Sequence, residues 1–154
     1  MKTHVNKLHI VSTITFILFL MLLFGCGRVV PKIHINKTSG GTVTLEVDVA
    51  KTPVQRTLGL MYRKSMPKNK GMLFIFDEEK TQNFTMKNTY IPLDMIFINR
   101  TKEIVGWVEN TKPLTEGPFK IEKPSLYVLE VNAFFCKING IAVGDKVSFE
   151  NFPK

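Results

Sequence analysis

The chain has 154 residues and a formal net charge of +8, from 21 basic and 13 acidic residues. This length supports one core without disulfides. The basic residues are scattered, with no Arg-rich cluster or aromatic RNA-binding motif, so no nucleic-acid partner is predicted. His4, His9 and His34 all precede the segment expected to fold, which argues against a histidine-based catalytic pair or zinc site there.

The N-terminus has the pattern of an export signal. Lys2 and Lys7 form a basic head, and an uncharged apolar stretch runs over residues 10–24. The following Leu23-Phe24-Gly25-Cys26 resembles the lipobox of bacterial lipoproteins, with Phe24 where a small or β-branched residue is usual. The resemblance implies cleavage after residue 25 and diacylation of Cys26. The alternative is an uncleaved membrane helix, for which the stretch is short.

We therefore expect an exported protein whose lipid on Cys26 anchors it to the cell membrane, on the envelope or extracellular side. Two acyl chains are enough for stable attachment. The basic domain would then lie near an anionic membrane surface, which attracts lysine and arginine. A lipidated Cys26 leaves Cys136 without an intrachain partner, so we interpret Cys136 as a small buried hydrophobe, with a reactive thiol as the alternative.

Three parts follow from this pattern: a signal peptide at 1–25, an irregular tether at 26–41, and one domain at 42–154. The domain opens with alternation over 42–49, which predicts a strand with one face exposed to water. Thr52, Pro53 and Gln55 form a capping-box pattern that predicts a helix start. Val54, Leu58 and Met61 would share its buried face, and Gly59 would allow close contact with the sheet.

The remaining elements are short. Further strands are predicted at 72–76, 83–88, 93–98, 103–108, 126–131 and 146–149, with an extended loop at 110–125 and a short helix at 132–139. This alternation predicts an α+β, β-rich fold: a curled, partly barrel-like, mainly antiparallel sheet with one or two short helices.

The segment 83–94 carries the main functional hypothesis. As a hairpin with a four-residue loop, it would pair Lys87 with Asp94 on one face. The other face would hold an apolar set: Phe84, Met86, Met95 and Phe97. The charged pair is either a structural ion pair or part of a polar pocket rim. The residues predicted to bind a ligand at this rim are Arg56, Arg63, Lys87, Asn88, Thr89 and Asp94.

Several stretches resemble the bacterial and archaeal family called domain of unknown function 192. They are Gln55-Arg56, Gly59-Leu60-Met61 with Arg63, Gly71-Met72-Leu73-Phe74, Met86-Lys87-Asn88-Thr89, Ile91-Pro92-Leu93-Asp94, Leu129-Glu130-Val131 and Gly144-Asp145. The resemblance implies a compact β-rich domain, often exported or anchored, with no established activity. Thr85 stands at a position that is commonly Trp in the family, and Phe134 at one that is commonly Gly.

Three functions stay open at this point. The first is a binding module for a small anionic ligand or an envelope partner, with arginine and lysine as donors. The second is a Cu(I)-handling lipoprotein that uses methionine thioethers: Met61, Met66, Met72, Met86 and Met95. The third is a carboxylate-dependent enzyme that combines Asp94 with Asp77, Glu78 or Glu79. No catalytic residue, resident metal or cofactor is predicted.

Overall fold

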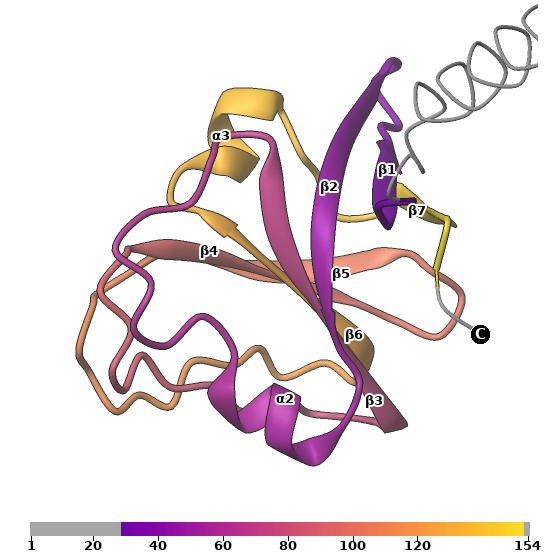
Figure 1. Ribbon diagram of the computed structural model, residues 1–154. Coiled ribbons are helices and arrows are strands. Elements are labelled where there is room, and N and C mark those ends of the chain that lie inside the picture. Colours follow the sequence, from indigo (N-terminus) through magenta and orange to yellow (C-terminus); the bar gives the residue numbers. More distant parts are fainter. Residues whose placement is uncertain (1–28, 153–154) are drawn as a thin grey trace, which may run out of the picture.

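The computed structural model describes residues 29–152, so the predicted signal peptide and the lipidation site Cys26 lie outside the described residues. Within 29–152, no helix is both long enough and apolar enough to cross a bilayer. The elements in chain order are β1 (Lys32–Asn36), β2 (Thr42–Ala50), α2 (Pro53–Leu58), β3 (Lys70–Lys80), β4 (Leu93–Ile98), β5 (Ile104–Thr111), β6 (Ser125–Asn132), α3 (Phe135–Asn139) and β7 (Lys146–Glu150) (Figure 1).

The strands form one curled sheet in the order β5-β4-β6-β3-β2-β1-β7. All neighbours are antiparallel except β2 and β3, which are parallel. The curl brings β7 against the turn between β4 and β5, where Val147 N–H donates to the carbonyl of Lys102 at 2.8 Å and Ile104 N–H to that of Asp145 at 2.9 Å. The β-rich α+β half-barrel predicted from the sequence is confirmed.

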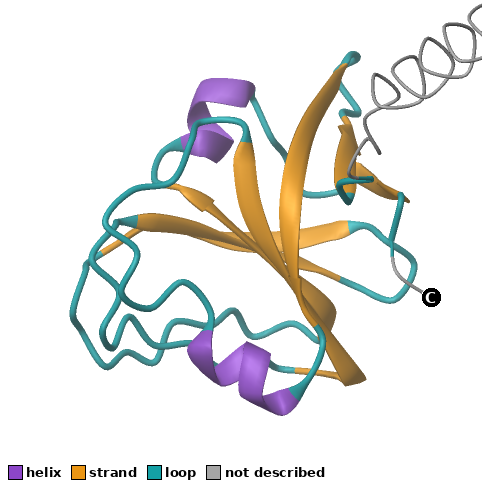
Figure 2. Ribbon diagram, in the orientation of Figure 1, coloured by secondary structure: helices purple, strands orange, loops and turns teal. Residues whose placement is uncertain are grey.

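The sheet buries both of its faces. Successive side chains of a strand point to opposite faces, so β4 sends Met95 and Phe97 to one side and Ile96 and Ile98 to the other. The apolar cluster that contains Ile96 and Ile98 fills the inside of the curl. The cluster that contains Met95 and Phe97 is covered mainly by α2 and by loops, which gather on the same side of the sheet (Figure 2).

The start of α2 follows the predicted chemistry. Thr52 Oγ1 accepts from Gln55 N–H at 3.2 Å, and Gln55 Oε1 accepts from Thr52 N–H at 2.9 Å, which completes the capping box. The predicted packing face is wrong, because Val54 is 78% and Leu58 53% exposed. The helix ends after six residues at Gly59, and the chain turns there toward the ring of Phe74.

The segment expected to be an irregular tether contains β1, so the prediction is wrong there. β1 pairs with β2 on one side and β7 on the other. Ile33 and Ile35 point into the core and are fully buried, while His34 between them faces outward. His34 Nε2 lies 2.9 Å from Glu150 Oε2. A histidine therefore belongs to the folded domain, contrary to expectation, and the alternation Ile33-His34-Ile35 was the signal for it.

The predicted hairpin 83–98 is also wrong. β4 pairs with β5 and β6, and residues 83–88 form no strand. Phe84 instead makes an isolated bridge with Phe119, with N–H to O distances of 2.9 Å in both directions. β6 offers β4 a ladder in continuous register, which a short segment with one bridge cannot match. The predicted apolar set still meets: Met86 and Phe97 are buried in one cluster, and Phe84 packs edge-on against Phe97.

Candidate functional site

A pocket of about 510 Å³ opens beside α2. Its walls come from α2 and the residues that follow it, from β3, from the segment 83–89 and from one residue of β6. Apolar side chains make up much of the wall: Leu58, Leu60, Met61, Phe74, Phe76 and Phe84. A smaller hollow of about 250 Å³ lies next to it and shares Arg56 and Phe76. A concave, largely apolar site with a few polar groups is typical of small-molecule binding.

Glu130 is the acidic residue among the described residues that line this pocket, and it is buried. It lies on β6 between Met72 of β3 and Met95 of β4, and is 4% exposed. Its carboxyl makes no hydrogen bond with any residue in the described part of the chain. Burial raises its pKa from 4.5 to about 8, so the group is largely protonated and neutral at pH 7.

Two basic residues line the pocket. The side chain of Arg56 is 16% exposed and is held by three partners: its guanidinium donates to the carbonyls of Lys51 at 2.7 Å and Ile75 at 2.8 Å, and pairs with Asp77 at 3.1 Å. Lys87 is exposed and forms no ion pair with any described residue. The uncompensated positive charge of the pocket rim is therefore that of Lys87.

Three of the six predicted ligand-binding residues line the pocket: Arg56, Lys87 and Thr89. Thr89 is 5% exposed, and its hydroxyl donates to the carbonyl of Lys87 at 3.3 Å. Thr85, the position that is commonly Trp in the resembling family, also lines the pocket. The local sequence 85–89 therefore does contribute to the site, although it does so as a loop.

Arg63 and Asn88 have other partners. Arg63 pairs with Asp48 of β2 at 2.7 Å and is not part of the pocket wall. Asn88 has a positive φ of 54° and donates through its side-chain amide to the hydroxyl of Tyr62 at 3.0 Å. Both side chains brace the segment after α2, which forms one wall of the pocket.

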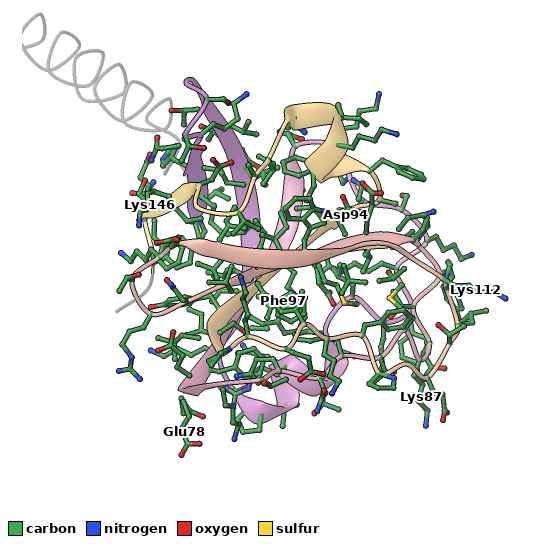
Figure 3. All side chains as sticks on the ribbon, turned by 180° about the vertical axis from the view of Figure 1, so that it is seen from behind. Glu78, Lys87, Asp94, Phe97, Lys112 and Lys146 are labelled. Carbon is green, nitrogen blue, oxygen red and sulfur yellow. The ribbon has the colours of Figure 1, made fainter. Side chains whose placement is uncertain are left out.

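The predicted Lys87–Asp94 pair does not exist. Asp94 is fully buried on the face of β4 opposite Met95, and its carboxylate accepts three backbone hydrogen bonds. Asn110 N–H and Phe134 N–H bind Oδ1 at 2.9 Å each, and Cys136 N–H binds Oδ2 at 3.0 Å. Figure 3 shows Asp94 beside α3 and Lys87 far from it, at the opposite end of the molecule.

Asp94 therefore has a structural role. The N-cap residue of α3, Phe134, makes no capping hydrogen bond with its own side chain, and Asp94 supplies the acceptor from β4. Phe134 has a left-handed φ of 65°, a conformation that glycine adopts without strain and most other residues do not. This explains physically why glycine suits the position in the family that this chain resembles.

Asp145 fixes a second pair of loops in a similar way. It is fully buried and accepts from Thr38 N–H at 2.8 Å, Thr38 Oγ1 at 3.0 Å and Ala142 N–H at 2.8 Å. Burial alone would raise the pKa of Asp145, but these hydrogen bonds and the nearby Lys37 charge outweigh it and lower the pKa below its ordinary value.

Cys136 is a buried free thiol, as predicted. Burial raises its pKa far above the ordinary range, and the adjacent Asp94 carboxylate adds to the effect. The thiolate is the nucleophilic form of cysteine, so this thiol is chemically inert at neutral pH.

The structure does not assemble the carboxylate pair of the enzyme hypothesis. Asp94 of β4 lies opposite Val131, at one end of β6. The other candidate acids lie on β3 just before Lys80, which is opposite Ser125 at the other end of β6. Six strand residues separate these positions, which corresponds to roughly 20 Å. Asp77 instead pairs with Arg56, and Glu79 with Arg100.

The methionines of the Cu(I) hypothesis are mostly core residues. Met66, Met72, Met86 and Met95 belong to one buried apolar cluster. Met61 is the one methionine among the pocket-lining residues that the structure describes.

The family model of DUF192, described as uncharacterized ACR, matches residues 34–149. The chain belongs to this family. A DUF192 relative from Pyrococcus furiosus, UPF0127 protein PF1050, is 28% identical over 118 residues, which cover 75% of this chain and 96% of the relative.

Two solved structures resemble this DUF192 domain. One is a protein of Sinorhizobium meliloti described as a “putative transcription regulator”, with a TM-score of 0.76 and 39% identity over 79% of this chain and 95% of that one. The other is a protein of unknown function from Novosphingobium aromaticivorans, with a TM-score of 0.73 and 32% identity over 76% and 83% of the two chains. The family relationship supports the fold and assigns no activity.

Proposed function

We propose that this protein is an envelope binding module that holds a small organic anion in the pocket beside α2. The observation that carries the proposal is a pocket of about 510 Å³ with apolar walls and one unpaired cation, Lys87, at its rim. An apolar body would fill the aromatic and aliphatic walls, and an anionic group would lie at Lys87, where water still reaches it.

The second basic residue, Arg56, mainly holds the pocket wall in place and is not free to pair with a ligand. Its guanidinium already satisfies two carbonyls and one carboxylate, and it lies 5.3 Å from the centre of the Phe76 ring. It therefore holds a wall of the pocket in place and adds a partly neutralised positive charge. The charge of Lys87 therefore gives the pocket its preference for an anionic ligand over a neutral one.

The proposal also places the protein in the cell envelope, anchored by a lipid on Cys26. The support is the basic head, the apolar stretch and the lipobox-like Leu23-Phe24-Gly25-Cys26. Because β1 begins at Lys32, only a few residues would separate Cys26 from the folded domain. Intact-mass measurement of the membrane fraction tests this: a lipidated chain beginning at Cys26 is expected, and a full-length mass with an unmodified Cys26 contradicts it.

The binding proposal is tested with matched ligands that differ only in charge. We expect 4-isopropylbenzoate, and the longer analogue in which a second benzene ring (a biphenyl) separates the isopropyl and carboxylate groups, to bind several-fold more tightly than the corresponding neutral amides. The affinities are measured by titration calorimetry of the full chain in lipid nanodiscs. Lys87→Met should abolish this preference because it removes the unpaired charge. Lys137→Met on α3, at the other end of the molecule (Figure 1), should keep it.

Equal binding of acids and amides to the wild-type chain would contradict the anionic ligand. If none of these ligands binds, the small-molecule proposal fails, and a protein partner in the envelope becomes the better hypothesis.

A further inference from the structure

We propose that Glu130 is a ligand-binding residue that donates a hydrogen bond from its carboxylic acid to a neutral carbonyl oxygen of the bound molecule. This inference rests on the proposed function and narrows its ligand class. The ligand would be an amphipathic keto, ester or amide acid: its anionic end faces Lys87, its apolar body fills the pocket, and its carbonyl reaches Glu130.

The position of Glu130 is rigid. β6 pairs with β3 on one side and β4 on the other, so both neighbours of Glu130 are ladder residues, Met72 and Met95. Gly71 packs so closely that a Cβ added to it would lie 2.7 Å from the carbonyl oxygen of Glu130. The backbone of Glu130 is therefore fixed, and its side chain, 4% exposed, lines the pocket.

The carboxyl of Glu130 lacks partners that the other buried acids have. Asp94 and Asp145 are as deeply buried, and each accepts three hydrogen bonds. Glu130 is 4% exposed, lines the pocket and accepts none from the described residues. A buried polar group without a partner is unfavourable. A ligand oxygen in the pocket would satisfy it.

The chemistry of this group selects a neutral acceptor. The flanking side chains are methionines, and the charged residues that line the same pocket are Arg56 and Lys87. Burial raises the pKa of Glu130 to about 8, so it carries a proton at neutral pH and has an O–H to donate. A neutral carbonyl oxygen accepts that hydrogen bond without placing a charge in the buried part of the pocket around Glu130.

The test compares two acids of nearly equal shape, 4-acetylbenzoate and 4-isopropylbenzoate, together with their two-ring counterparts. Only the acetyl compounds carry a carbonyl. With the full chain in lipid nanodiscs at pH 6.5, we expect the better-fitting acetyl compound to bind about tenfold more tightly than its isopropyl match, as one hydrogen bond predicts. The ratio of the two affinities cancels any effect of pH that is common to both compounds.

The pH dependence has a definite sign. Donation needs protonated Glu130, so the affinity ratio should stay nearly constant below pH 7 and fall about fivefold between pH 6.5 and pH 9 as the acid ionises. Glu130→Gln keeps an N–H donor without a titrating proton, so its ratio should persist and lose its pH dependence. Glu130→Leu should bind both compounds equally. Glu103→Gln, outside the pocket, should match the wild-type chain.

The outcomes separate the two proposals. If 4-isopropylbenzoate binds as tightly as 4-acetylbenzoate, the role of Glu130 is overturned and the organic-anion pocket stands. If neutral 4-methylacetophenone binds as tightly as 4-acetylbenzoate and both weaken in Glu130→Leu, Glu130 keeps its role and the anionic ligand is overturned. If no probe binds, both are overturned.

Discussion

Replacing Glu130 by glutamine is expected to raise the free energy of unfolding at pH 8 by on the order of 4 kcal/mol, and to change it little at pH 4. The folded state raises the pKa of Glu130 from 4.5 to about 8, so between these values the folded protein holds a proton that the unfolded chain has lost. Stability therefore falls as pH rises through this window. Glutamine has no proton to lose, and its stability does not fall for this reason.

Urea denaturation at pH 4, 6 and 8 measures this effect on a chain that begins at Val29, just before β1. The difference between Glu130→Gln and the wild-type chain should grow steadily across the three pH values. Glu103→Gln is the matched control, because Glu103 is only half-buried and pairs with Lys146 at 2.7 Å. A difference that stays constant with pH would show that the Glu130 carboxyl is not desolvated in the folded protein.

Asp94→Asn is expected to lower the free energy of unfolding by about 4 kcal/mol. The carboxylate accepts from Asn110 N–H, Phe134 N–H and Cys136 N–H in a fully buried site. An asparagine keeps one acceptor oxygen, but its NH₂ group must face at least one of these donors. The variant therefore loses a charge and leaves buried N–H groups without partners, which detaches α3 from β4.

The same substitution at an exposed acid is the control. Asp77 is 84% exposed, so Asp77→Asn should cost less than about 0.5 kcal/mol. A double-mutant cycle between Asp94→Asn and Lys87→Met should give additive changes, since the two side chains do not interact. A loss below about 1 kcal/mol for Asp94→Asn, or a strong coupling to Lys87, would contradict the assignment of Asp94 to α3.

Asp94 and Glu130 are buried acids on neighbouring strands, β4 and β6, but their carboxyl groups have different surroundings. Asp94 faces backbone N–H groups near the start of β4, and Glu130 faces apolar side chains at the floor of a pocket. The first carboxylate is used to hold the fold together. The second has no such use within the described chain, and this contrast makes Glu130 the strongest functional candidate in the domain.

Local chemistry in the sequence was sufficient for several elements. The capping box of Thr52 and Gln55 depends on residues three apart, so it could be identified before the fold was known. Alternation identified β2, because the side-chain period of a strand is a property of the strand itself. The helix predicted at 132–139 ends at the same residue as α3, Asn139, and Gly140 after it has a left-handed φ of 62°.

The pairing of strands was decided only by the tertiary structure. Alternation within a strand shows which of its side chains share a face, and it correctly grouped Met95 and Phe97. It does not show which strand lies alongside, because a distant strand can offer a longer ladder than a sequence neighbour. β4 pairs with β6, and this removed the predicted hairpin and with it the Lys87–Asp94 pair.

The candidate site shows the same division. The sequence by itself predicted that Arg56, Lys87 and Thr89 would lie at one polar rim, with Lys87 on a strand of a hairpin. The three residues do line one pocket, but Lys87 lies in a loop, and only the tertiary structure decided that. The sequence placed Glu130 in a predicted strand and in a stretch that resembles the family, but it could not identify Glu130 as a site residue. Only the packing of β3 and β4 on either side of β6 decides that this carboxyl is buried, unpartnered and open to the pocket.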